Sequence, residues 1–565
     1  PLISCTAMEL DEDCSIILEL PDSDPLYNDK KNLLQMKGFK TRVPVHLKSF
    51  EHPDIGRTSL QEMLQISRII NLDEVELYFL EDDVSSPVEF YSPRNEIVSL
   101  NSILKLVENS LSSCTQELRK CVLHKCKVAI VNMIGDVSDK ICMKSVVVED
   151  HSCVKENCLL QWGKDNGVKT RLQIAYVKGA GRGATAREDL KVGDTALEIP
   201  ASLIISEGLV QNSDMYHILE KVDGMASETM LLLWSMKEKY NQSSKFKFYF
   251  DMLPEEFHTG LSFGVQALMV LDETVLLDEI VQAKEHLQSQ YDELIPSLCK
   301  KHPDIFPPHL YTWEKFLWAC ELWYSNSMQI MFPDGKLRTC LIPIAGFLNH
   351  SLYPHIINYG RVDSTTNTLK FCLSRPCSAG EECLLSYGNF SSSHLVTFYG
   401  FLPKGDNPYD VIIPVGIEDI TLEDDYEDDS SVENPSSDGF SMDNHVSNDS
   451  SMDNHVSNDS SMDKPESNDS SMDIPSSFDD AIKGEGDSLS NLTTHMVRGT
   501  WFSKYHDIFH YGLPSRFLDY LRRARNPKLH TKTHESLETE VEVLQKVHDY
   551  FDDMMERLGD PYFDG

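Results

Sequence analysis

The chain has 565 residues, more than one hydrophobic core normally organises, so two or three domains are expected. Its apolar fraction of 41% suffices for globular domains, and no run of about 18 apolar residues predicts a membrane span. The formal net charge of −39 argues against nucleic acid as a direct partner, because phosphate binding needs clustered Lys and Arg. A basic protein substrate is compatible with this acidity.

Residues 1–155 show helical hydrophobic spacing but no chemical motif. The stretches 58–72 (TSLQEMLQISRIINL) and 99–111 (SLNSILKLVENSL) predict helices, whereas 74–81 and 127–137 fit either strands or helix ends. The first residues show neither the apolar core of a secretory signal nor an Arg/Ser-rich transit pattern. We predict an accessory region of unknown role.

Fourteen cysteines are scattered along the chain without a paired CxxC spacing. Cys372, Cys377 and Cys383 come nearest to a cluster, but a closed zinc site needs four converging ligands. We predict free buried thiols, no metal site, and an intracellular, reducing compartment. The sequence does not choose among cytoplasm, nucleus and chloroplast stroma.

The hydrophobic pattern of the chain changes twice between residues 160 and 402. Short alternating strands with glycine turns are predicted from 160 to 200, and helical periodicity dominates from 206 to 320. Short strands and turns return from 338 to 402. The pattern predicts a strand-rich core that is split by a helical insertion.

A ten-residue polar repeat follows, beginning SMDNHVSNDS at residues 441 and 451. Such a unit cannot bury enough apolar surface to offset the entropy of ordering, so residues 419–490 are predicted to be a disordered acidic linker. Helical patterns resume after it. In the last one, apolar residues step by three and four from Leu537 to Leu558, which predicts a stripe that faces a core or a partner.

Three short motifs are candidates for chemistry. GAGRG, residues 179–183, fails as a dinucleotide loop because its spacing is GxGxG and no full helix follows, but its glycines permit a backbone to lie against a ligand. Asn349 and His350 end the apolar run 341–348, and Tyr387 and Tyr399 each precede a glycine at the end of a later apolar run. Taken singly, each of these residues also fits a structural role.

Taken in order, these motifs resemble the SET-domain methyltransferases, specifically the branch typified by the Rubisco large-subunit lysine methyltransferase and its animal cytosolic relatives. The string GRGATAREDLKVGDTALEIPASLII, residues 181–205, is similar nearly end to end to the opening motif of that branch. The resemblance covers about 160–415 well and about 490–560 loosely. It leaves residues 1–155 outside.

The resemblance implies an α+β fold with a β-rich, knotted SET core and a mostly helical C-terminal domain. The core would span 156–403, with the helical insertion at about 206–335. The substrate-binding domain would comprise 404–418 and 491–565, interrupted by the disordered segment 419–490. A monomer that docks a protein substrate on the C-terminal helices is expected, with no nucleic acid and no membrane as partners.

The resemblance also implies a cofactor, S-adenosylmethionine, and assigns residues to it by motif. The residues expected to bind the cofactor are Gly181, Arg182, Gly183, Asn349, His350 and Tyr399. Tyr387 is expected to be catalytic, at the channel through which the methyl group passes. The expected reaction is methylation of a lysine, whose pKa near 10.4 falls in a dry aromatic channel beside a positive charge. No metal and no acidic general base are required.

Two departures from the family pattern bear on activity. Gly346 stands where relatives often have Asp, and Asn326 stands where they often have Arg. The cysteine clusters that mark many histone-tail enzymes are missing, which favours a non-histone substrate. The alternatives are an inactive SET scaffold that only binds partners and a histidine methyltransferase.

Overall fold

The computed structural model describes residues 15–47, 53–79, 92–141, 145–148, 153–272, 274–403, 407–410, 413–415, 495–497, 518, 521–522 and 537–558. Within these ranges, no helix combines the length and the apolar character that crossing a membrane requires.

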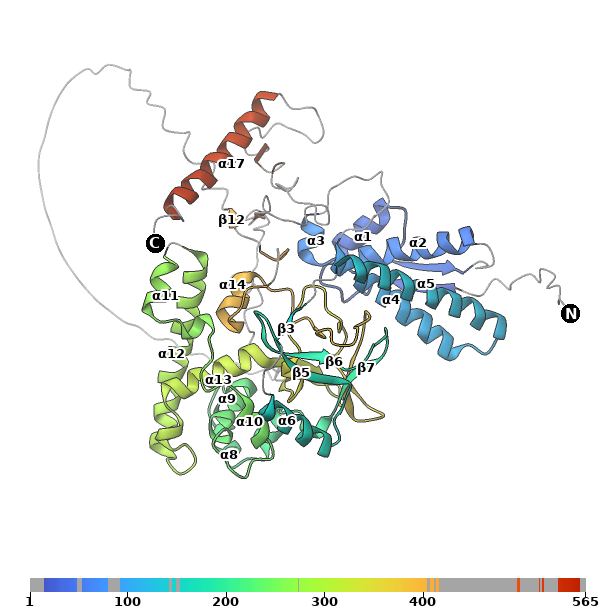
Figure 1. The fold of residues 1–565 in the computed structure, drawn as a ribbon. Helices are drawn as coiled ribbons and strands as arrows, with labels where there is room; N and C mark the ends of the chain where they lie inside the picture. Colours follow the sequence, from blue (N-terminus) through green and yellow to red (C-terminus); the bar gives the residue numbers. More distant parts are fainter. Residues whose placement is uncertain are drawn as a thin grey trace, which may run out of the picture.

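The N-terminal unit is a two-stranded sheet covered by helices, drawn in blue in Figure 1. Its elements are β1 (Ser15–Glu19), α1 (Tyr27–Met36), β2 (Arg42–His46), α2 (Pro53–Ile70), α3 (Glu74–Tyr78), α4 (Pro93–Ser113) and α5 (Glu117–Ile141). The two helices predicted from spacing are confirmed as parts of α2 and α4. The two ambiguous stretches, 74–81 and 127–137, contribute to the helices α3 and α5.

Local sequence explains where the helices of this unit begin. The hydroxyl of Ser92 accepts a hydrogen bond from the Asn95 amide, and Pro93 occupies the first turn of α4. Asp73 and Glu76 form a reciprocal capping box at the start of α3. Apolar faces of α2, α4 and α5 then enclose a core of their own around residues such as Met63 and Leu100.

The central region contains the strands of the strand-rich core that the sequence predicts. They are β3 (Val147–Val148), β4 (Lys169–Thr170), β5 (Leu172–Val177), β6 (Gly181–Ala186), β7 (Thr195–Pro200), β8 (Ser327–Met331), β9 (Leu337–Leu341), β10 (Val362–Asp363) and β11 (Thr368–Cys372). They pair antiparallel in three small sheets, in the orders β3-β5-β6, β10-β11-β7-β4 and β8-β9. Helix α6 (Val154–Asp165) precedes β4.

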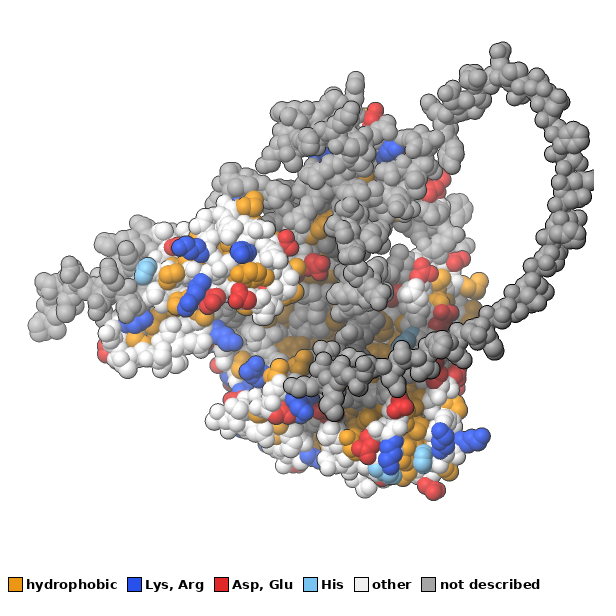
Figure 2. Space-filling view, turned by 180° about the vertical axis from the view of Figure 1, so that it is seen from behind, with side chains coloured by type: hydrophobic (Ala, Val, Ile, Leu, Met, Phe, Trp, Pro, Cys, Tyr) orange, Lys and Arg blue, Asp and Glu red, His pale blue; other side chains and the backbone are white. Residues whose placement is uncertain are grey.

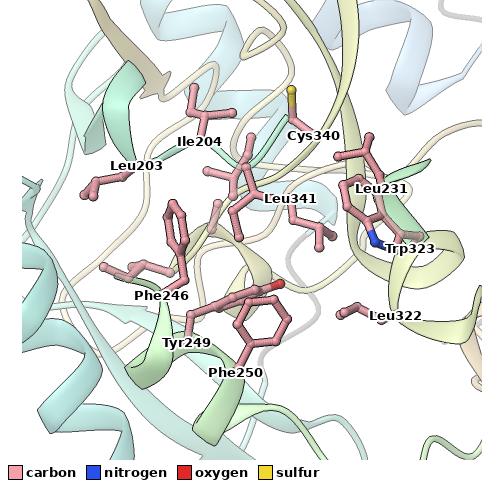
Figure 3. Packing of buried hydrophobic residues seen from close by; sticks show 14 of the residues in the cluster. Leu203, Ile204, Leu231, Phe246, Tyr249, Phe250, Leu322, Trp323, Cys340 and Leu341 are labelled. Carbon is pink, nitrogen blue, oxygen red and sulfur yellow. The ribbon is translucent and has the colours of Figure 1, made fainter. Parts of the chain in front are cut away.

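A helical insertion separates β7 from β8, as the sequence predicts. Its helices are α7 (Glu207–Gln211), α8 (Tyr216–Leu219), α9 (Ser227–Glu238), α10 (Lys247–Met252), α11 (Val265–Val270), α12 (Val275–Lys301) and α13 (Trp313–Asn326). It ends at Asn326, earlier than the expected boundary near 335, because SMQIM forms β8. Figure 3 shows Phe246 and Tyr249 of the insertion packed around Leu341 of β9, so insertion and strands share one core.

The chain after residue 403 is described only in part. Strand β12 (Ile413–Val415) pairs antiparallel with β13 (His495–Val497), and α17 spans Leu537–Leu558. Helix α17 confirms the helix that is predicted from the spacing of apolar residues from Leu537 to Leu558. Of its apolar stripe, Val547 is buried, but Val541 and Leu544 are 57% and 47% exposed. The segment 419–490 and its repeat lie outside the described residues, and the knotted threading stays a prediction.

The N-terminal unit is hydrogen-bonded to the core at two places. The side-chain amide of Asn101 donates to the Ser374 backbone carbonyl oxygen at 3.0 Å. Asp73 Oδ2 accepts from the Asn389 amide at 3.2 Å and from the Tyr409 hydroxyl at 2.8 Å. Asn389 follows the SYG motif directly, so this unit reaches the neighbourhood of Tyr387.

Candidate active site

The second half of GAGRG opens strand β6, and its glycines differ in their surroundings. Gly181 has φ +72° and open space around it, a conformation that side chains rarely adopt. Gly183 is buried, and a Cβ there would lie 2.7 Å from Glu382 Oε1 and 3.1 Å from Asn349 Nδ2. Only glycine lets β6 approach these two side chains so closely.

The Arg182 side chain points toward the helical insertion. Its Nη1 donates to the Met252 carbonyl oxygen at 2.9 Å and lies 3.7 Å from the Glu156 carboxylate. The guanidinium also lies over the Phe347 ring, 5.7 Å from its centroid, so its own contacts are with Met252, Glu156 and Phe347. What Arg182 offers to the site is its backbone, because the Asn349 amide donates to its carbonyl oxygen at 3.0 Å.

Asn349 ties three segments together. Besides Arg182, its amide donates to Glu382 Oε1 at 2.8 Å, and its own carbonyl oxygen accepts from the Leu385 amide at 3.0 Å. Glu382 is 3% exposed and was not predicted as a site residue. Its sequence signal was the second of two consecutive acids, Glu381 and Glu382, just before the apolar run CLLSYG.

His350 presents a buried donor without a partner. Its Nδ1 accepts the Tyr387 backbone N–H at 3.1 Å, which places the proton of the neutral ring on Nε2. Nε2 is buried and has no hydrogen-bond partner within the described residues. Burial also lowers the pKa of His350 to about 4, so the ring is neutral at pH 7. A buried orphan donor costs about 1–3 kcal/mol, which an acceptor on a bound ligand would offset.

Tyr387 and Tyr399 form an aromatic wall beside His350. Their rings stack with centroids 5.2 Å apart and planes 23° from parallel, and the ring of Phe401 meets Tyr387 edge-on at 6.2 Å. The Tyr387 hydroxyl donates to the Leu348 carbonyl oxygen at 3.1 Å. Burial raises the pKa of both phenols, which stay protonated across the neutral range.

The structure thus brings the predicted site residues into one connected group. Asn349 joins β6 to the strand-like segment around Leu385, and His350 joins the same turn to Tyr387. Tyr399 completes the wall from the π-helical turn Leu395–Tyr399. Two predicted groups make no hydrogen bond to this set within the described residues: the Arg182 guanidinium, which contacts Met252, Glu156 and Phe347, and Gly181 at the exposed start of β6.

The two departures from the family pattern lie side by side. A Cβ at Gly346 would sit 3.3 Å from Asn326 Oδ1. The Asn326 amide donates to the Ser325 hydroxyl, which itself donates to the Glu321 carbonyl oxygen. A small, neutral pair therefore occupies these two positions. The Ser325 hydroxyl is engaged by both Asn326 and Glu321.

Ile344 introduces backbone strain just before the Asn-His turn. It has φ +75°, in which a β-branched residue costs about 1–3 kcal/mol, and is 6% exposed. It immediately precedes the single turn Ala345–Phe347 that leads to Asn349. Packing in the core holds this conformation, which directs the turn toward β6.

His355, Cys377 and Cys383 form a buried cluster near the site, with potential ligand atoms within 4.8 Å of one another. Both ring nitrogens of His355 are already used, since Nδ1 accepts the Leu384 amide at 3.1 Å and Nε2 lies 3.1 Å from Glu381 Oε1. A metal would have to displace one of these contacts. Hydrogen bonding to Cys383 and burial raise the pKa of the Cys377 thiol, and the cluster is a packed hydrogen-bonded set.

Acidification should destabilise the folded chain through its buried histidines. Burial lowers the pKa of His350 and His394 to about 4, against about 6.5 in the unfolded chain. As pH falls from about 6.5 to 4, these histidines take up protons in the unfolded state but not yet in the folded state. Each histidine therefore lowers the free energy of unfolding by about 1.4 kcal/mol per pH unit. We expect the thermal midpoint to fall across this window, and less steeply in His394→Phe, which keeps the stacking on Phe390. Scanning fluorimetry from pH 7.5 to 4.5 measures it.

The exposed His548 supplies the control for this experiment. His548→Phe should leave the pH slope unchanged. Equal slopes for the wild-type chain and His394→Phe would contradict the assignment.

Comparisons with known proteins find one family model and several methyltransferases that are similar to parts of this chain. A family model described as Rubisco LSMT substrate-binding matches residues 21–130. The chain is 26% identical over 266 residues to the chloroplastic [fructose-bisphosphate aldolase]-lysine N-methyltransferase of Arabidopsis thaliana, covering 45% of this chain and 54% of that protein. It is 24% identical over 254 residues to the chloroplastic Rubisco large-subunit N-methyltransferase of Nicotiana tabacum, covering 43% and 50%.

Some similar proteins are named for histidine rather than lysine methylation. The actin-histidine N-methyltransferase of Gallus gallus is 24% identical over 267 residues, covering 46% of this chain and 44% of that protein. A crystal structure of the SET domain of LSMT bound to lysine and AdoHcy aligns with a TM-score of 0.40 at 22% identity, covering 44% and 57%. The matched stretch spans about half the length of these relatives.

The family-model match falls at the opposite end of the chain from the expected one. We predicted an accessory region of unknown role at 1–155 and a substrate-binding domain at the C-terminus. The match instead lies on 21–130, within the N-terminal unit. Helical spacing alone gave no signal for this role, and the C-terminal assignment stays a prediction.

Proposed function

We propose that this chain, a member of the SET-domain methyltransferase branch typified by the Rubisco large-subunit enzyme, methylates a lysine side chain of a non-histone protein with S-adenosylmethionine. The observation that carries the proposal is the connected group of Gly183, Asn349, His350 and Tyr387. These residues come from segments far apart in the sequence, and they meet around the buried Nε2 of His350, for which the described part of the chain offers no partner.

The residues present fit the cofactor. The bare backbone at Gly181 leaves open space at the start of β6, Gly183 lets β6 lie against Asn349 and Glu382, and the neutral His350 offers its Nε2–H to an acceptor. Asn349 holds β6 and the Leu385 segment in register, which makes it a positioning residue as well as a binding one. Tyr399 would cover the site from the side of the π-helical turn. When bound, S-adenosylmethionine supplies a methyl group on a positively charged sulfur.

The aromatic wall suits an amine acceptor. A lysine must lose its proton before it attacks, and a poorly solvated channel lowers the pKa of the amine from about 10.4. The Tyr387 phenol, held by the Leu348 carbonyl oxygen, keeps its proton at neutral pH and fixes one wall of the channel. Alignment of the amine with the methyl carbon can supply several kcal/mol of the barrier, about 7–11 in favourable cases.

We further propose that the protein substrate docks on the N-terminal unit. The family-model match names this kind of domain, and Asp73 connects the unit to Asn389, two residues after Tyr387. The capping box of α3 fixes Asp73 through Oδ1, while Oδ2 pairs with Arg94 of the same unit and accepts from Asn389 and Tyr409. A substrate held by this unit would therefore lie close to the channel.

The C-terminal residues remain the second proposed docking region. Strands β12 and β13 pair antiparallel as β1 and β2 do, and the amphipathic α17 resembles α4 in length. These likenesses support a second unit of the same kind after the core. The exposed Val541 and Leu544 of α17 would contribute an apolar surface to it.

Loss of the contacts around Asp73 should weaken docking without changing the chemistry. The double variant Asn389→Ala, Tyr409→Phe removes the two partners of Asp73 Oδ2 that come from the core and leaves its ion pair with Arg94 and the capping box intact. We expect KM for the protein substrate to rise about tenfold, corresponding to about 1.4 kcal/mol, with kcat nearly unchanged. Steady-state kinetics on the methylated protein measures it.

Asn212→Ala is the control for docking, because its amide bonds only within the exposed end of α7. An unchanged KM in the double variant would remove the N-terminal unit from the docking proposal.

The activity itself is tested with labelled cofactor. The full chain and Tyr387→Phe are incubated with a proteome extract, and labelled bands are hydrolysed for amino-acid analysis. Methyl-lysine with the wild-type chain and a strongly reduced signal with the variant is the expected result. Methyl-histidine would transfer the activity to histidine, and no labelling together with tight, Asn349-dependent cofactor binding would leave a binding scaffold.

A further inference from the structure

A cavity lies in the helical insertion, and none of the candidate active-site residues lines it. It has a volume of about 370 Å³ and is formed between α8 and the C-terminal half of α12. Its floor is apolar: Ile218 and Leu298 are buried, and Val222 and Leu294 are half-buried. The proposed methyl transfer uses none of these residues.

The rim of this cavity is basic. Lys221 and Lys301 are exposed, and neither forms an ion pair within the described ranges. His217 and His302 stand beside them, and the single acid of the lining, Glu293, accepts a hydrogen bond from the Ser289 hydroxyl. Figure 2 shows basic and histidine side chains beside hydrophobic atoms at the lower right, with acidic side chains among them. In a chain of net charge −39, two lysines without acidic partners beside an apolar hollow call for an anionic, partly apolar ligand.

The chain itself carries a segment with this chemistry. The tripeptide Ser-Met-Asp recurs with a period of ten at residues 441–443, 451–453, 461–463 and 471–473. Each copy places a flexible apolar methionine next to a carboxylate. From residue 418 to residue 490 there are 22 acids and two lysines, so the segment holds about half of the net charge.

We propose that the groove between α8 and α12 docks this Ser-Met-Asp repeat of the same chain. A methionine side chain enters the apolar floor, since its unbranched thioether adapts to irregular hollows, and the adjoining aspartate meets Lys221 or Lys301. Four copies compete for one groove, which multiplies the effective concentration of the motif. The groove is thus an intramolecular binding site for an acidic, methionine-bearing peptide.

The chain can reach the groove. Strand β12 ends at Val415, and the first repeat methionine is Met442, so 26 residues, or 27 steps from Cα to Cα, bridge the gap. Fully extended, they span roughly 90 Å, which exceeds the diameter of about 60 Å expected for a folded chain of this size. The pairing of β12 with β13 holds both ends of the segment at one place, so docking leaves the flanking structure intact.

Zero-length crosslinking of the full chain tests the proposal. A carbodiimide joins a lysine amine only to a carboxylate in direct contact, and digestion with mass spectrometry identifies the pairs. We expect Lys221 and Lys301 to couple to the aspartates of the repeat at least fivefold more often than the exposed Lys191 and Lys336 do. Replacing the four repeat methionines by serine should bring the excess down to the control level, and 0.5 M NaCl should reduce it.

A mixture of ¹⁴N- and ¹⁵N-labelled chains separates intramolecular from intermolecular pairs. Crosslinks within one isotope class support the proposal. Equal coupling at all four lysines, an excess that survives the methionine replacements, or crosslinks only between isotope classes would each overturn it. The last outcome would assign the groove to a second copy. Methyl transfer does not enter the readout, so the result is independent of the proposed activity.

Discussion

Tyr387→Phe is expected to lower kcat about 100-fold while leaving cofactor affinity within a few-fold of the wild-type value. The hydroxyl is the only part removed, and with it goes the hydrogen bond to the Leu348 carbonyl oxygen. Loss of one preorganised polar group at a reacting centre costs about 10²–10³ in kcat. The phenylalanine ring keeps the stacking on Tyr399, so the pocket stays filled. Single-turnover methylation of the identified substrate and cofactor calorimetry measure the two quantities.

Tyr311→Phe is the matched control for this variant. Its buried hydroxyl also donates to a carbonyl oxygen, that of Leu233, but within the helical insertion. Both substitutions should cost about 1 kcal/mol of stability, because each removes one buried hydrogen bond. Only the Tyr387 variant should lose turnover. An equal kcat in the two variants would leave Tyr387 as a structural residue.

The pH dependence adds a separate constraint on the same residue. Burial raises the pKa of the Tyr387 phenol, so the hydroxyl does not titrate in the neutral range. A rise of activity between pH 7 and 9 would therefore report on deprotonation of the substrate amine rather than on this phenol.

The elements of the core and the order of its motifs could be predicted from sequence because both are local. The strand LQIAYV, the helix around Trp234 and the glycines of β6 each follow from short-range periodicity and turn chemistry. The segment EVELY was ambiguous since five residues show no full helical period. Its helix is set by the capping box of Asp73 and Glu76, a signal that periodicity does not measure.

The contacts that assemble the site could not be read from the sequence. Glu382 binds Asn349 across 33 residues, and Asp73 binds Asn389 across 316. Neither acid belongs to a motif, and their partners are fixed only by the tertiary fold. Arg182 is the opposite case. The motif identified the residue, but nothing in the sequence indicated that its guanidinium donates to the Met252 carbonyl oxygen in the insertion.

Gly183→Ala is expected to weaken S-adenosylmethionine binding about 100-fold while the chain remains folded. The added Cβ would lie 2.7 Å from Glu382 Oε1 and 3.1 Å from Asn349 Nδ2, the two ends of one hydrogen bond. Glu382 is buried, so moving it strips a carboxylate of a partner at a cost of about 3 kcal/mol, or roughly 100-fold. The displaced Asn349 also loosens the turn that orients His350.

Gly208→Ala separates this effect from the general cost of replacing a glycine. It lies in α7 with nothing within 4 Å of the new Cβ, and alanine there should be neutral or stabilising by up to about 1 kcal/mol. Isothermal titration with cofactor, beside thermal unfolding of both variants, distinguishes a blocked site from an unfolded chain. If Gly183→Ala binds cofactor as tightly as Gly208→Ala, the cradle formed by β6, Asn349 and Glu382 does not hold the ligand. The site would then have to lie elsewhere on the core, since Asn349 and His350 are oriented by that cradle.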